Sequence, residues 1–112
     1  MIDLTYIIHD MNNMKIKQSV HYNGKQYKLP FLIAKETLST EMETVKNPFS
    51  GQSISMPSFA VAVYDVIIGS NHMAEQYDSK HGMGTSPQWD TVRKGLDWFR
   101  QYFAKEYMVL LD

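Results

Sequence analysis

The stretch that decides the fold is residues 86–105, SPQWDTVRKGLDWFRQYFAK. Ser86 is a typical N-cap residue, and Pro87 suits the first helical position because an N–H there would have no helical partner. Apolar side chains then recur at helical spacing and form one stripe, made of Trp89, Val92, Leu96, Phe99 and Phe103. We therefore expect one amphipathic helix from Pro87 to Lys105, packed on a core.

A second and more buried helix is expected from Pro57 to Tyr77, with Pro57 in its first turn. One broad and mainly apolar face, which Ala60, Tyr64 and Ile68 widen, consists of Phe59, Val63, Val66, Ile67, Ser70, Ala74 and Tyr77. A buried strand at 59–63 is the alternative, because short apolar runs fit both structures. Asp65 is the unusual carboxylate in this stretch. If it is buried it needs a partner, either in a structural network or in a functional site.

The dipeptide Asn23-Gly24 predicts a hairpin within residues 14–35, because a type I′ turn needs positive φ at both central residues. The predicted pairs are Tyr22 with Lys25, His21 with Gln26, Val20 with Tyr27 and Ser19 with Lys28. One face of this hairpin is then mainly apolar and the other polar. The second strand is expected to continue through residues 31–33, with Pro30 at an edge or a bulge.

Residues 40–46 fit two structures. Thr40, Met42 and Thr44 alternate with acids, as in a strand, whereas the spacing of Leu38, Met42 and Val45 would suit a helix. A strand is favoured because the turn sequence NPFSG follows at 47–51, and 53–56 can return as the partner strand.

The two ends of the chain complete the expected architecture. Residues 3–13 read as a short amphipathic helix, and the apolar tail 107–112 is expected to dock on its own sheet or on a partner. We predict one α+β domain spanning residues 1–112. It would consist of an N-terminal helix, an antiparallel meander of three to four strands, and two C-terminal helices packed on one sheet face.

The composition excludes several classes of protein. The 112 residues include no cysteine, which removes disulfides, Cys-ligated zinc, iron–sulfur clusters and thiol catalysis. A formal net charge of −1 gives no support to a general polyanion binder. The first residues lack the pattern of a signal peptide, and the most apolar run, 59–68, is too short to cross a membrane. We expect a cytoplasmic protein that needs no cofactor.

Few side chains suggest catalysis or metal binding. His72 and Glu75 are three residues apart on the expected helix, and His81 follows in a glycine-flanked loop, so these three could hold a divalent metal. The alternative is surface histidines near a helix end. Nucleophile-elbow, dinucleotide and Walker A motifs are missing from the sequence, so no catalytic residue is assigned and an enzyme is not favoured.

A lysine-rich hairpin face is the candidate for nucleic-acid contact. Residues 11–35 contain no acid, and the predicted register puts Lys15, Lys17, His21 and Lys28 on one face. The aromatic side chains lie mainly on the other face, which counts against base stacking. A solvated strand face is the alternative, because lysine also protects edge strands from aggregation.

An apolar surface near the C-terminus is the candidate for protein contact. It would consist of Trp98, Tyr102, Tyr107, Met108 and Leu110. Such a surface predicts a protein partner or self-association.

Four short segments resemble small marine bacteriophage proteins that have no established activity: 47–51 (NPFSG), 62–65 (AVYD), 95–99 (GLDWF) and 107–112 (YMVLLD). The resemblance implies a phage setting and the cytoplasm of the host cell, and it transfers no catalytic residue. The leading prediction is therefore a non-enzymatic phage accessory or interaction protein. A nucleic-acid-binding module and a small metal-dependent enzyme are the alternatives.

Overall fold

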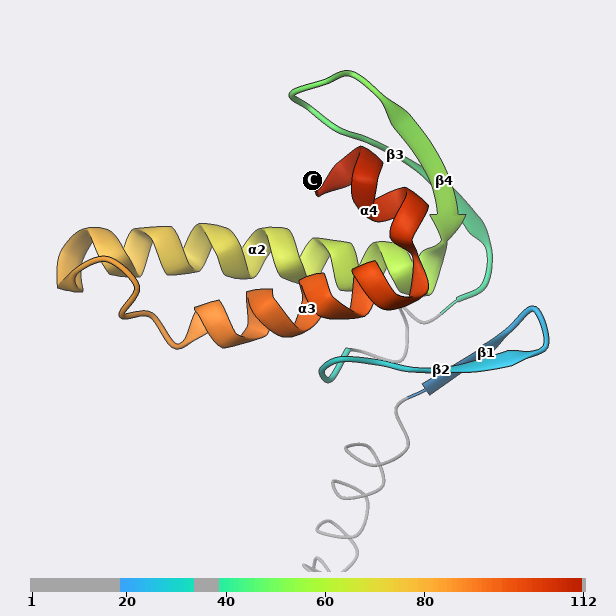
Figure 1. Cartoon of the computed structure of the whole chain (residues 1–112), viewed down its shortest axis with the longest axis horizontal. Helices are drawn as coiled ribbons and strands as arrows, with labels where there is room; N and C mark the ends of the chain where they lie inside the picture. Colours follow the sequence, from blue (N-terminus) through green and yellow to red (C-terminus); the bar gives the residue numbers. More distant parts are fainter. Residues whose placement is uncertain (1–18, 34–38, 112) are drawn as a thin grey trace, which may run out of the picture.

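The computed structural model describes residues 19–33 and 39–111 (Figure 1). The elements in this part of the chain are the strands β1 (Ser19–Tyr22), β2 (Lys25–Lys28), β3 (Met42–Lys46) and β4 (Ser53–Pro57), and the helices α2 (Ser58–His81), α3 (Gln88–Tyr102) and α4 (Ala104–Leu110). The fold is α+β, as predicted. The N-terminal helix predicted at 3–13 lies outside the described residues.

The β1–β2 hairpin confirms the predicted register, from Ser19 opposite Lys28 to Tyr22 opposite Lys25. Its turn residues Asn23 and Gly24 have φ values of 51° and 75°, the left-handed conformation that a type I′ turn requires. The strand does not continue through 31–33 as predicted. Pro30 explains this end, because proline has no N–H to donate to a neighbouring strand.

Residues 42–46 form a strand, which confirms the favoured reading of this segment. β3 pairs with β4 in antiparallel register, from Met42 opposite Pro57 to Lys46 opposite Ser53. The two hairpins form separate two-stranded sheets, so the predicted meander of three to four strands is wrong. Figure 1 shows the hairpins apart, both near the end of the helix pair where α2 begins.

Helix α2 is longer than predicted and includes His81, which the sequence had suggested to lie in a loop. Pro57 precedes the helix in an extended conformation, with a ψ of 149°. At the start of α3, the backbone N–H of Gln88 donates to Oγ of Ser86 over 3.1 Å. Ser86 therefore caps α3, as the sequence indicated.

The single helix predicted from 87 to 105 is wrong, because the chain breaks at Phe103 and continues as α4. Phe103 has φ −136° and ψ 57°, and its ring is buried against Phe59, Trp98 and Phe99. The break turns the chain so that α4 lies against β4 (Figure 1). The tail thus docks on the chain's own sheet, one of the two outcomes expected.

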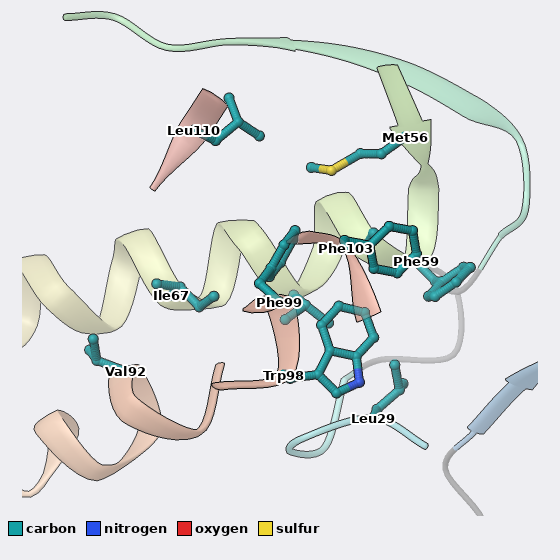
Figure 2. Packing of buried hydrophobic residues seen from close by; sticks show 11 residues of the cluster. Leu29, Met56, Phe59, Ile67, Val92, Trp98, Phe99, Phe103 and Leu110 are labelled. Atoms are coloured by element: carbon teal, nitrogen blue, oxygen red, sulfur yellow. The ribbon is translucent and has the colours of Figure 1, made fainter. Parts of the chain in front are cut away.

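The buried core lies where the helices meet the hairpins, with rings from α2 and α3 at its centre (Figure 2). Helices α2 and α3 pack chiefly on each other rather than together on one sheet face, which corrects the predicted layering. The main core side chains are Leu29, Met56, Phe59, Val63, Ile67, Val92, Trp98, Phe99, Phe103 and Leu110. Among the residues described, no helix has both the length and the apolar character needed to cross a bilayer.

Candidate functional site

An apolar groove of about 570 Å³ lies between the three helices and the β3–β4 turn. Its residues come from four segments that are distant in the sequence. They are Ile67, Ile68 and Asn71 of α2, Val92 and Leu96 of α3, Leu110 and Leu111 at the end of α4, and Asn47, Phe49 and Ser50 of the turn.

The groove exists because of how the helices pack. Gly95 lets α3 approach α2 closely, since a Cβ there would lie 2.7 Å from Cδ1 of Ile67. The break at Phe103 then sends α4 away from the α3 axis and places Leu110 beside α2 and α3. A continuous α3 would have carried the apolar tail past the end of the helix pair.

The turn that borders the groove is held by a network of hydrogen bonds centred on Asn47. Its Oδ1 accepts the N–H of Phe49 over 2.8 Å, and its backbone bonds to Gln52 and Gly51. Its Nδ2 donates to the carbonyl of Val109 over 2.9 Å, which ties the turn to α4. The ring of Phe49 is nonetheless 98% exposed. The turn therefore presents an aromatic side chain to solvent from a fixed backbone.

The chemistry of the groove is that of a contact surface. Its polar residues are Asn47, Ser50 and Asn71, and within residues 19–33 and 39–111 no charged side chain or histidine lines it. Asn71 already donates to Oε1 of Glu75 over 3.1 Å. The apolar walls of the groove would be stabilised by losing contact with water.

The predicted contact residues divide between the core and the surface. Trp98 and Leu110 are both mostly buried within the chain. Tyr102 and Tyr107 are half-buried and lie beside Lys25 and Arg100 respectively. Met108 is exposed, and Leu110 is the one member of the predicted set that lines the groove.

The predicted metal ligands do not come together. Within residues 19–33 and 39–111, no group of three His, Asp or Glu side chains is arranged to hold a metal ion. His72 and His81 are nine positions apart on one straight helix, roughly 13 Å along its axis. The ring of His81 instead stacks on Tyr77, with 4.1 Å between ring centroids.

The predicted nucleic-acid face is described only in part. His21 and Lys28 are exposed on the β1–β2 hairpin, whereas Lys15 and Lys17 lie outside the described residues. The aromatic residues of this hairpin face the protein. The rings of Tyr22 and Tyr27 pack against Phe59, with 5.6 Å between centroids in each pair.

Asp65 is exposed, and it borders a second recess of about 370 Å³. Partial desolvation raises the pKa of the Asp65 carboxyl above its usual value, and the nearby charge of Glu43 raises it further. Glu41 also lines this recess, together with serines and small apolar residues. The carboxylates repel one another, and none of the described residues that line the recess is basic, so we assign it no ligand.

The sequence alone does not identify Phe49 and Ile68, two exposed apolar residues that line the groove. The sequence predicts Phe49 only as part of a turn, although an aromatic residue between Pro48 and Ser50 at a turn tip is itself a signal of exposure. The sequence predicts that Ile68 widens a buried helix face, yet its side chain is 46% exposed and lines the groove.

Comparison of the chain with protein-family models, curated proteins and solved structures found no match.

Proposed function

We propose that this chain is a non-enzymatic protein-binding module and that the apolar groove is its binding surface. The observation that carries the proposal is a groove walled by six apolar side chains, with a fully exposed aromatic ring at its edge. Of the apolar residues that line the groove, Ile68 and Phe49 are exposed and Leu96 and Leu111 are half-buried. Apolar surface that remains accessible beside an aromatic residue is typical of protein interfaces. The role of a phage accessory protein in the host cytoplasm rests on the sequence resemblance alone.

A matched pair of substitutions on α2 tests the groove. Ile68→Glu places a charge in the groove, and Met73→Glu places the same charge outside it on the same helix. The two side chains are similarly exposed, at 46% and 54%, so neither variant should unfold the chain. Circular dichroism would check that both variants keep the helical content of the wild type.

The measurement is selection of random peptides on the wild-type chain, immobilised sparsely so that each molecule acts alone. We expect apolar peptides that bind the wild type and Met73→Glu equally and bind Ile68→Glu at least ten-fold more weakly, because a buried unpaired charge costs more than about 1.4 kcal/mol. The proposal would be contradicted if the selected peptides bind the wild type and both variants equally well. It would also be contradicted if the selection gives no binding peptide.

A further inference from the structure

We propose that the groove receives Phe49 of a second copy of this chain, so that two copies exchange their Phe49 rings about a two-fold axis. The inference rests on the proposed function, because it names the occupant of the same groove. Phe49 lines the groove from the β3–β4 turn, so ring and groove lie on one face. A two-fold dimer brings the same patch of each copy together, and a patch holding both a ring and its receptor is self-complementary.

The conformation of the turn favours this role for Phe49. A ring that is 98% exposed does not fill the groove of its own chain, although it stands at the edge. Its backbone is fixed through Asn47, whose Oδ1 accepts the N–H groups of Phe49 and Ser50 over 2.8 and 3.4 Å. A fixed backbone lowers the entropy lost on binding, which favours anchoring by this side chain.

Charge also favours a second copy as the occupant. Among the described residues that line the groove none is charged, so these parts of two copies can meet without bringing like charges together. The net charge of the chain is only −1, so overall repulsion between copies is small. An occupant with a charged contact face would find no partner for its charges among the described residues that line the groove.

The area involved indicates a dimer that dissociates on dilution. A phenylalanine side chain buries about 150–250 Å², so two exchanged rings supply roughly 300–500 Å². Stable dimers bury about 1,200–2,000 Å² in total, and the groove walls and turn must supply the remainder. We therefore expect monomers and dimers to coexist at ordinary laboratory concentrations.

Sedimentation velocity over a range of concentrations tests the inference. We expect the mass of the wild type to rise from 13.0 kDa toward twice that value as concentration increases. Phe49→Ser removes the ring and Ile68→Glu blocks the groove, so each should stay monomeric. The control for Phe49→Ser is Met83→Ser, at a side chain that is 97% exposed, and the control for Ile68→Glu is Met73→Glu. Both controls should dimerise like the wild type.

Mixing the two defective variants tests the exchange itself. The Ile68→Glu chain keeps its ring and the Phe49→Ser chain keeps its groove, so a mixed pair can form one of the two ring–groove contacts. We expect the mixture to associate more than either variant alone. A mixture that stays monomeric, or a wild type that is monomeric at every concentration, would overturn the inference. If the wild type is monomeric but groove-dependent peptides are still selected, the proposed function stands and only the second copy is wrong.

Discussion

Asp78 fixes the loop between α2 and α3 through a single carboxylate. Its Oδ2 accepts the N–H of Gly84 and Nε1–H of Trp89, both over 2.7 Å, and its Oδ1 accepts the N–H of Ser86 over 3.0 Å. Partial desolvation raises the pKa of Asp78, but the hydrogen bonds from Gly84, Trp89, Ser86 and Thr85 together lower it by more, so the net pKa is below the usual value. This residue determines both the geometry of the loop and part of its pH dependence.

Because the pKa of Asp78 is lower in the folded state, the stability that this carboxylate contributes falls as the pH falls. The contribution of Asp78 to stability is complete above the unfolded pKa of about 3.9 and is lost as pH falls through the folded pKa. We expect Asp78→Ala to melt several degrees below the wild type at neutral pH, with the gap narrowing in acid. Thermal unfolding followed by circular dichroism measures both temperatures.

Asp97→Ala is the control for Asp78→Ala, because the interaction that Asp97 makes is an exposed ion pair with Arg100 over 3.1 Å. Exposed pairs of this kind contribute little to stability, so its melting temperature should change by no more than a degree or two. A difference in melting temperature between the wild type and Asp78→Ala that stays constant from neutral pH to acid would contradict this prediction. That result would show that the charge of Asp78 is not the cause of the lost stability.

At the scale of the element, two helical glycines should respond oppositely to the same substitution. Gly69 has open space around it in α2, so Gly69→Ala should stabilise the chain by about 0.5–1 kcal/mol through helix propensity. A Cβ at Gly95 would lie 2.7 Å from Cδ1 of Ile67 and 3.3 Å from Cε1 of Phe31. Gly95→Ala should therefore destabilise by about 1–3 kcal/mol.

Urea denaturation of the two variants gives the free energies of unfolding directly. Each variant serves as the control for the other, because the substitution and the helical setting are the same. Equal stabilisation by both would show that α2 and α3 are not in close contact at Gly95.

Elements differ in how far the sequence predicts them. The β1–β2 register follows from two residues, Asn23 and Gly24, because a two-residue turn leaves only one pairing. The start of α3 follows from Ser86 for a similarly local reason. The end of α3 could not be predicted, since Phe103 is neither glycine nor proline and its apolar ring continues the helical stripe. Only the packing of its ring against residues from α2 and β2 distinguishes it.

At the scale of the whole molecule, Trp98 joins the first hairpin to the helices. Its Nε1–H donates to the carbonyl of Lys28 over 2.7 Å, a contact between residues seventy positions apart. Trp98→Phe keeps an apolar ring but removes this donor, so we expect a loss of about 1–3 kcal/mol in the free energy of unfolding. Hydrogen exchange should accelerate in β1 and β2 more than in β3 and β4.

Trp89→Phe is the matched control for Trp98→Phe. It also removes an indole donor, but its partner is Asp78, so faster exchange should be confined to the loop between α2 and α3. If Trp98→Phe accelerates exchange equally in both hairpins, the bond to Lys28 does not anchor the first hairpin specifically.

The sequence by itself determined the type I′ hairpin and its register and the helical start of α3, and it favoured the strand at 42–46 and the helix α2 over their alternatives. These depend on φ preferences and apolar spacing within a few residues. The tertiary structure alone decided that the hairpins form separate sheets, that Trp98 and Leu110 are buried, and that four distant segments wall one groove. Burial depends on which apolar surfaces cover one another over the whole chain, and no local pattern encodes that choice.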